Sequence, residues 1–347
     1  MKIIVAGVDY PPRPHMVSWF ARAFRRFGCE VTVVGATKDT QAGDGDTFID
    51  WMFEQPAHRF DGQRVTTSTV LATTGDHDAI VMVDQGDDWS LVNDGKIPYA
   101  YVWREGNRAE ESRVHESVGD SPCFVCMLGK GTKWPARSEF MPFAADQFFL
   151  SRGRPYETRE HGFIYTGRER GSGTNARLTA EFAKLEMTTH IPGYIKGYSA
   201  YANQLGAAKT TYVVDSGTYV GSRGLEAMAA GCVVFWDGGE AFDHLGFIPG
   251  RDCLMMPANK VGDDYEPPKN FPVMAAEIAK AKDRWIAMSQ AAKRAIRTAH
   301  TYQHRVQRIA DVLGLKLPKT VDESQETSCH CPTHRRRAWS QAAQNCR

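Results

Sequence analysis

The sequence predicts an α/β protein with two Rossmann-like domains. An apolar strand that ends in glycine (residues 2–7) precedes a proline-rich loop, an amphipathic helix at 16–27 and a second strand at 29–35. The same order restarts at 162–167, where an apolar segment again ends in glycine and a helix is expected at 175–185. A length of 347 residues favours two domains over one.

Composition along the chain sets the expected boundaries. The segment 151–160 is polar and interrupted by Gly and Pro, as linkers are. We therefore assign residues 1–150 to the first domain and 151–298 to the second. A helix is expected at 299–315, and the remaining residues, 316–347, form a basic tail with Cys and His that lacks periodicity.

Further strands are expected where short apolar runs occur between turn signals. In the first half they are predicted at 79–83, 98–103 and 122–127. In the second half they are predicted at 188–191, 211–214 and 232–236, and a long basic helical region at 272–315 follows.

The bulk properties favour a cytoplasmic protein that does not span a membrane. No apolar run approaches the roughly 20 residues that a transmembrane helix needs. The N-terminus enters a strand directly, without the pattern of a cleavable signal. Eight cysteines scattered through a chain of this size indicate reduced thiols rather than a disulfide framework.

Charge is divided unevenly between the two halves. The whole chain has a formal net charge of +1. Residues 1–145 carry 15 Lys and Arg against 20 Asp and Glu, and residues 146–347 carry 27 against 21. A basic second half suits an anionic ligand such as a nucleoside diphosphate.

The most informative segment is 215–237. A glycine-punctuated loop, 215–221, leads into a predicted helix with Glu226 in its first turn and a stop at Gly231. The N-terminus of a helix offers free N–H groups and a positive dipole end to a phosphate. Glu226 is placed to accept hydrogen bonds from a sugar hydroxyl beside that phosphate. The pattern indicates a nucleotide-sugar.

Three residues form the turn into this helix. The N–H groups of Gly221, Ser222 and Arg223 are predicted to hold the distal phosphate. The ordinary structural alternative is a capped helix with Ser222 as N-cap and Arg223 paired with Glu226.

These segments resemble GT-B glycosyltransferases, in the group that includes spore-maturation-type enzymes and retaining enzymes with a two-glutamate motif. The resemblance rests on the strand–glycine opening, Met141-Pro-Phe-Ala-Ala-Asp146, Phe163-Ile-Tyr-Thr-Gly-Arg168 and the helix at 222–231, and covers about residues 1–315. It implies two Rossmann-like domains facing a central cleft, with the acceptor on the first, the nucleotide-sugar on the second and a C-terminal helix that crosses back to the first domain. Such enzymes generally hold the diphosphate without a metal cofactor.

The resemblance also implies roles for single residues. Glu226 matches the glutamate that bonds the nucleotide ribose. Arg168 and Arg177 resemble the cationic pair that neutralises the leaving diphosphate, and Gly193 is expected near the base. The family's second glutamate lies eight positions earlier, where this chain has Thr218. That departure leaves the donor sugar and the stereochemistry open.

Catalytic candidates in the first domain follow predicted strands. His15 ends the proline-rich loop after the first strand, where an acid, a base or a contact to the donor sugar is expected. Asp84 and Asp87 follow the strand at 79–83, and one of them would deprotonate the acceptor hydroxyl if the reaction inverts. The structural alternatives, without a catalytic role, are a helix N-cap for Asp87 and a solvated loop for His15.

Two cysteine groups raise the question of metal binding. Cys123 and Cys126 fall on a predicted strand with side chains on opposite faces, so we expect buried thiols rather than metal ligands there. The tail carries a set able to surround a structural Zn²⁺ ion, with a disordered basic tail as the alternative. That set consists of Cys329, Cys331, His334 and Cys346.

The leading functional hypothesis is a glycosyltransferase that uses a nucleoside diphosphate sugar, with UDP as the expected nucleotide. A hydroxymethylated pyrimidine in DNA is one acceptor, as in virus-encoded DNA-modifying members, because basic residues at 280–308 and 335–337 suit phosphates. A polysaccharide or a small metabolite is the alternative acceptor. Other classes are a nucleotide-sugar 2-epimerase and a nucleic-acid-binding protein with a zinc tail.

Overall fold

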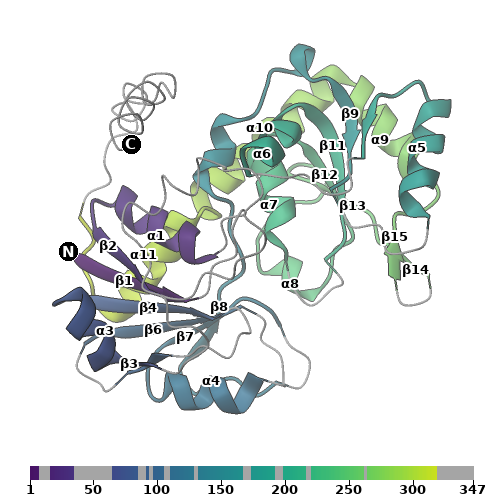
Figure 1. Ribbon diagram of the computed structural model, residues 1–347. Helices are drawn as coiled ribbons and strands as arrows, with labels where there is room; N and C mark the ends of the chain where they lie inside the picture. The colour runs from purple at the N-terminus through teal and green to yellow at the C-terminus, as the bar shows by residue number, and fades with distance from the viewer. Residues whose placement is uncertain are drawn as a thin grey trace, which may run out of the picture.

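A computed structural model shows a mixed α/β protein with two parallel sheets, which confirms the predicted fold class (Figure 1). The structure describes most of the chain outside its loops and tail: residues 1–7, 16–34, 65–84, 91–93, 97–104, 110–128, 132–166, 173–191, 198–215, 220–261 and 264–318.

The first sheet has six parallel strands in the order β2-β1-β4-β6-β7-β8. These strands are β1 (Lys2–Gly7), β2 (Glu30–Val34), β4 (Ala79–Asp84), β6 (Tyr99–Trp103), β7 (Cys123–Val125) and β8 (Ser138–Phe140). Its helices are α1 (Met16–Arg26), α3 (Thr67–Thr74) and α4 (Glu111–Val118), and β3 (Val65–Thr66) pairs with β5 (Leu91–Val92) beside it.

The second sheet has five parallel strands in the order β10-β9-β11-β12-β13. They are β9 (His161–Ile164), β10 (Thr189–His190), β11 (Ala208–Val213), β12 (Val233–Trp236) and β13 (Leu254–Met255). Around them lie α5 (Thr174–Lys184), α6 (Tyr198–Gly206), α7 (Ser222–Ala229), α8 (Glu240–Asp243), α9 (Phe271–Lys280) and α10 (Lys282–Ala299).

Smaller elements join these layers. Two short 3₁₀ helices, η2 (Gln147–Ser151) and η3 (Tyr156–Thr158), form much of the connection between the sheets. An antiparallel pair, β14 (Asn259–Val261) and β15 (Asp264–Glu266), projects beside the second sheet. The long basic region predicted at 272–315 consists of three helices, α9, α10 and α11 (Tyr302–Leu313). It breaks at Ala281, between α9 and α10, and again between Ala299 and Tyr302.

Both faces of each sheet are covered, which explains why the strands are continuous apolar runs. On β1, Ile3 and Val5 face the core that contains α1, whereas Ile4 and Ala6 face α3 and α4. On β12, Val234 and Trp236 likewise point to one core, and Val233 and Phe235 point to the other. This alternation is the period of two that a strand imposes.

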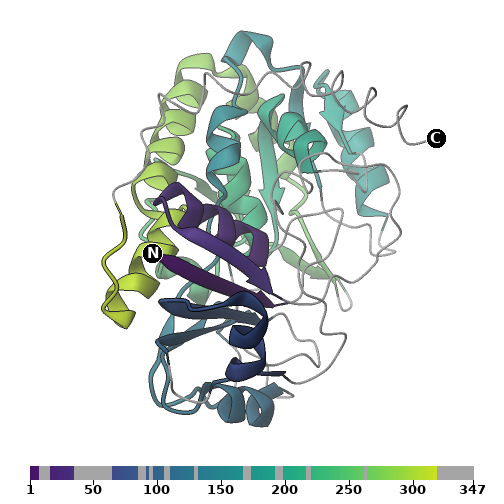
Figure 2. The same ribbon diagram turned by 60° about the vertical axis from the view of Figure 1, so that its left-hand side comes forward.

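The last helix, α11, crosses back to the first sheet, as predicted. The N–H of Ala145 donates to the carbonyl of His300 (2.8 Å), and the N–H of Tyr302 donates to the carbonyl of Ala145 (3.2 Å). α11 then lies beside α1 (Figure 2). Arg305 donates to the carbonyls of Pro142 and Phe143, which fixes α11 to the end of the first domain.

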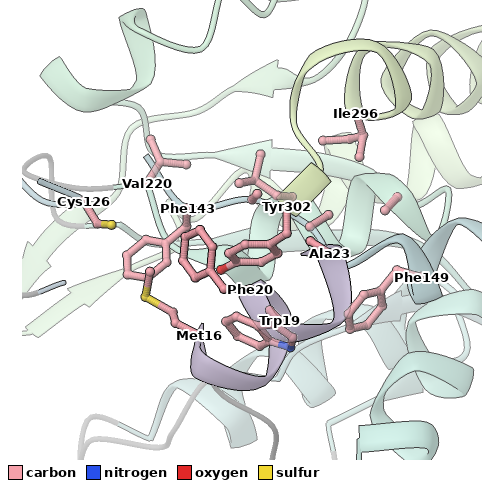
Figure 3. Close-up of a cluster of buried hydrophobic side chains, with 14 of the residues drawn as sticks. Met16, Trp19, Phe20, Ala23, Cys126, Phe143, Phe149, Val220, Ile296 and Tyr302 are labelled. Atoms are coloured by element: carbon pink, nitrogen blue, oxygen red, sulfur yellow. The ribbon is translucent and has the colours of Figure 1, made fainter. Parts of the chain in front are cut away.

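A buried cluster rich in aromatic side chains packs at the junction of the two domains (Figure 3). The ring of Tyr302 lies 5.1 Å from that of Trp19 and 5.3 Å from that of Phe20 on α1. Val220, which precedes the N-cap of α7, belongs to the same buried cluster as Phe143 of the first domain. The turn into α7 is therefore packed against the domain junction.

A buried ion pair lies beside this cluster. Arg22 of α1 donates to Asp146 over 2.8 Å, and their side chains are 7% and 3% exposed. Asp146 also accepts the backbone N–H of Phe148 and so caps η2. One carboxylate thus joins the first domain to the start of the connection.

Among the described residues, the helices are all too short or too polar to cross a membrane.

We expect Arg22→Met to destabilise the protein strongly, because it leaves Asp146 buried without its partner. The expected cost is about 3–5 kcal/mol, measured as the shift in urea unfolding. Arg308→Met is the matched control: it breaks an exposed pair with Glu139 and should cost about 1 kcal/mol or less. Equal effects of the two variants would contradict the importance of the buried pair.

Candidate functional site

The candidate site lies at the switch point of the second sheet. From β9 the chain proceeds to β10 on one side and then to β11 on the other, so the connections diverge between β9 and β11. In open α/β sheets ligands bind outside the carboxyl ends of the strands at such a point. Thr166 follows β9 and Asp215 follows β11 there, and α7 begins nearby (Figure 1).

The start of α7 differs from the sequence prediction in two ways. Gly221 is the N-cap and Ser222 is the first helical residue, so Ser222 is not the cap. Glu226 is the fifth residue and lies beyond the first turn. A dipole interaction in the first turn therefore does not explain this glutamate.

No side chain caps α7. A glycine at the N-cap has no oxygen to offer the N–H groups at the start of the helix, whereas Ser, Thr, Asp or Asn would occupy one of them. The helix therefore begins with backbone donors that are suited to an anion. The helix ends as predicted, with Gly231 at a φ of +80°.

Glu226 is buried in a hydrogen-bonded group at this point, with its side chain 3% exposed. The hydroxyl of Tyr201, on α6, donates to Glu226 Oε2 over 3.0 Å. The side chain of Thr166 also interacts with the Tyr201 hydroxyl, and that of Ser222 interacts with the Glu226 carboxyl group. Residues from the end of β9, from α6 and from α7 are thereby joined.

Burial raises the pKa of Glu226 to about 7. The hydrogen bond from Tyr201 and the nearby Arg223 favour the charged form, while the charge of Asp146 disfavours it. A carboxyl group that titrates near neutrality, in a position that binds ligands in this class of sheet, is typical of a functional site.

Asp215 is a second buried acid at the same edge, 3% exposed. The indole N–H of Trp236 donates to its Oδ2 over 2.6 Å, and its own backbone N–H donates to the carboxylate of Asp237. Burial raises the pKa of Asp215 to about 8, while the hydrogen bond from Trp236 lowers it.

Arg177, on α5, is directed toward the β15 segment. It donates to the carbonyl of Pro267 (3.0 Å) and lies 3.5 Å from a carboxylate oxygen of Glu266. Its guanidinium is 30% exposed, so part of it remains accessible.

Asp84 is the last residue of β4 and is buried in the first domain. It accepts from the hydroxyl of Tyr101 (2.6 Å) and from Arg113 (2.7 Å). Both partners hold the carboxylate within the first domain, which favours a structural role over deprotonation of an acceptor.

Four of the eight basic residues at 280–308, predicted to reach nucleic acid, make bonds within the chain. Arg305 donates to the carbonyls of Pro142 and Phe143, and Arg308 makes two bonds to Glu139. Lys282 pairs with Glu157, and Lys280 donates to the carbonyl of Leu185. These four side chains therefore serve the fold, which weakens the argument for DNA from this region.

Several predicted residues lie outside the described part of the chain: His15, Asp87, Arg168, Gly193, Thr218, Cys329, Cys331, His334 and Cys346. Within the described residues, no group of three or more His, Cys, Asp or Glu could hold a metal ion. Cys123 and Cys126 are buried free thiols, as expected, and burial raises the pKa of each to about 12.

Comparison with known proteins gives a similarity over the second half of the chain. Residues 165–311 match a family model described as glycosyl transferase-like, a range that contains the α7 segment. The chain as a whole has the GT-B fold of solved glycosyltransferases. A search of curated proteins gave no match.

Solved glycosyltransferases share the fold at low sequence identity. HepE of Anabaena in complex with UDP aligns over 90% of this chain and 100% of its own, with a TM-score of 0.59 and 12% identity. An α-glucosyltransferase in complex with UDP and a 13-mer DNA containing an HMU base aligns over 90% of this chain and 99% of its own, with a TM-score of 0.58 and 10% identity. A glycosyltransferase from Rickettsia africae aligns over 90% of this chain and 99% of its own, with a TM-score of 0.55 and 8% identity.

The sequence argument did not assign a role to three residues of this candidate site: Tyr201, Asp215 and Trp236. Tyr201 lies on α6, a helix that was not predicted, and nothing in its local sequence marks it as a partner of Glu226. Asp215 and Trp236 were visible as the ends of apolar runs. Only the parallel pairing of β11 with β12 shows that they meet.

We expect Glu226→Gln to raise the free energy of unfolding at pH 8 by about 1–3 kcal/mol and to change it little at pH 4. A carboxyl group whose folded pKa is raised stabilises the fold below its unfolded pKa of about 4.5, and this stabilisation is lost as pH rises through about 7. Glutamine stays neutral and can still accept from Tyr201.

Thermal unfolding at both pH values checks this. The matched control is Glu181→Gln, which changes an exposed glutamate on α5 that pairs with Lys184. It should give no stabilisation at pH 8. A loss of stability for Glu226→Gln at pH 8 would contradict the predicted sign.

Proposed function

We propose that this protein transfers a sugar from a nucleoside diphosphate sugar, with UDP as the nucleotide, to an acceptor hydroxyl. The observation that carries the proposal is Glu226, buried at the switch point behind the uncapped start of α7. The second domain binds the donor in this proposal, and the first domain binds the acceptor. The UDP in compared glycosyltransferases of the same fold supports the choice of nucleotide.

Glu226 accepts hydrogen bonds from the ribose hydroxyls in this proposal. Its charged form, favoured by Tyr201 and Arg223, is the better acceptor. The N–H groups of Gly221, Ser222 and Arg223 bind the diphosphate in this proposal. Negative charge grows on that diphosphate as the glycosidic bond breaks, so these donors stabilise the transition state more than the ground state.

The remaining site residues take the roles that the sequence suggested. Arg168 and the accessible part of Arg177 neutralise the diphosphate, and Gly193 lies near the base. On the acceptor side, His15 and Asp87 are the proposed acid–base residues. Asp84 is the weaker candidate, because Arg113 already holds its carboxylate.

We expect UDP-sugars to raise the melting temperature in a panel of nucleoside diphosphate sugars, with the cognate donor giving the largest shift. Glu226→Ala should weaken binding of that donor by about 10- to 100-fold, the value of one or two hydrogen bonds to a charged group. Glu181→Ala, on the exposed face of α5, is the matched control and should bind like the parent protein. If no nucleotide-sugar binds or is hydrolysed, the proposed function is wrong.

The proposed acceptor is a hydroxymethylated pyrimidine in DNA, which is the finer part of the proposal. It is supported by a compared α-glucosyltransferase in complex with DNA containing an HMU base. The negative first half of the chain and the intramolecular bonds of Arg305 and Arg308 count against it. A polysaccharide or small-metabolite acceptor would need no such positive surface.

We expect sugar transfer to duplex DNA that contains hydroxymethylated pyrimidine, and none to unmodified duplex, when both are incubated with the cognate donor. Binding should weaken as salt rises from 50 to 200 mM, because phosphate contacts release counterions. Transfer to a polysaccharide instead of DNA would show that the proposed acceptor is wrong. Formation of an epimerised free nucleotide-sugar would show that the protein is an epimerase and not a transferase.

The proposed zinc site in the tail is tested separately by deleting residues 319–347. Loss of bound zinc, with donor turnover kept, would make the tail an accessory module. Absence of zinc from the full chain would exclude the site.

A further inference from the structure

Tyr201 is a side chain of the candidate site that the proposed donor contacts leave without a role. Its hydroxyl donates to Glu226 Oε2 over 3.0 Å, although the two residues are 25 positions apart. Tyr201 lies on α6 and Glu226 on α7, and these helices pack side by side (Figure 1). The bond is therefore a product of helix packing.

Glu226 needs such a partner to present its carboxylate in one orientation. A glutamate side chain loses considerable rotamer freedom when it is ordered, so a ligand that has to order it binds more weakly. A hydrogen bond to one carboxylate oxygen fixes the plane of the group before the ligand arrives. A carboxylate offers about four lone-pair positions, so the bond from Tyr201 leaves acceptor capacity for hydroxyls of a ligand.

Tyr201 is itself held by the connection between the domains. Its ring lies 5.9 Å from that of Phe149 of η2, at an interplanar angle of 80°. Phe149 is fully buried and also contacts Tyr198, which lies one turn earlier on α6, at 5.1 Å. Tyr198 in turn stacks on Phe148 at 5.7 Å. Two tyrosines thus fix one side of α6 against η2, and this arrangement directs the Tyr201 hydroxyl to Glu226.

The chemistry of the donor suits a binding carboxylate. A phenol is neutral, so it orients Glu226 without cancelling the negative charge that makes the carboxylate a strong acceptor. Burial and the charge of Glu226 raise the pKa of Tyr201 well above its ordinary value, so the phenol keeps its proton and donates.

We infer that Tyr201 is the residue that positions Glu226, so that the donor site selects a nucleotide with ribose hydroxyls over one without them. The inference rests on the proposed function, because it assumes that Glu226 accepts hydrogen bonds from the ribose. Tyr201 acts through Glu226 and does not itself touch the ligand. Its loss therefore weakens the part of binding that depends on the ribose hydroxyls.

The test compares UDP with 2′,3′-dideoxy-UDP, which lacks the ribose hydroxyls. We expect the parent protein to bind UDP about 10-fold or more tightly than the dideoxy nucleotide. Tyr201→Phe removes the hydroxyl and keeps the ring that packs on Phe149. It should weaken UDP about 5- to 10-fold and leave the dideoxy nucleotide within about twofold. Isothermal titration calorimetry measures both affinities.

A double-mutant cycle tests whether Tyr201 acts through Glu226. In the Glu226→Ala background, Tyr201→Phe should change the UDP affinity by less than about twofold, because the carboxylate that it positions is gone. A loss as large as in the parent background would mean that Tyr201 contacts the ligand or only maintains the fold. That result would overturn the inference.

The matched control is Tyr156→Phe. It removes another tyrosine hydroxyl of the second domain, one that donates to the carbonyl of Ala279 over 2.6 Å, and should leave both affinities unchanged. Retained binding of the dideoxy nucleotide shows that Tyr201→Phe is folded.

The outcomes separate this inference from the proposed function. If the parent protein does not bind UDP, the proposed function is wrong and the inference falls with it. If the parent binds both nucleotides equally, UDP binding stands but Glu226 does not bind the ribose, and the inference is wrong. If the parent prefers UDP and Tyr201→Phe weakens both nucleotides equally, or neither, the proposed function stands and the positioning role is overturned.

Discussion

The packing of α11 onto α1 is the constraint on which the arrangement of the two domains depends. The ring of Tyr302 packs against the rings of Trp19 and Phe20, and the buried pair of Arg22 with Asp146 lies beside them. Apolar burial supplies the stabilisation, and the ion pair sets the geometry, because a misaligned buried charge is costly. The chain end thereby fixes the first domain against the second.

The residues of this junction lie close in sequence to those of the candidate site. Val220 is part of the buried junction cluster, and Gly221 and α7 follow it directly. The charge of Asp146 also acts on Glu226 and raises its pKa. The glutamate proposed to bind ribose is therefore sensitive to the residue that organises the connection between the domains.

The local features of the sequence predicted most of the fold. Strands buried on both faces must be apolar throughout, so β1, β4, β6 and β12 were recognisable as runs. Gly231 was recognisable because a helix end in the left-handed region favours glycine. The capped-helix alternative placed the N-cap of α7 one residue too late, at Ser222 instead of Gly221, since a glycine N-cap carries no side-chain signal.

By itself the sequence predicted the two α/β units, and its resemblance to GT-B glycosyltransferases added the return of the last helix and Glu226 as the candidate for binding ribose. Only the tertiary structure decided which groups surround that glutamate. Tyr201, Asp215 and Trp236 come from different elements, and their meeting depends on strand order and helix packing. Hydrogen bonds between residues more than 20 positions apart leave no periodic trace in a sequence, because each partner is ordinary in its own segment.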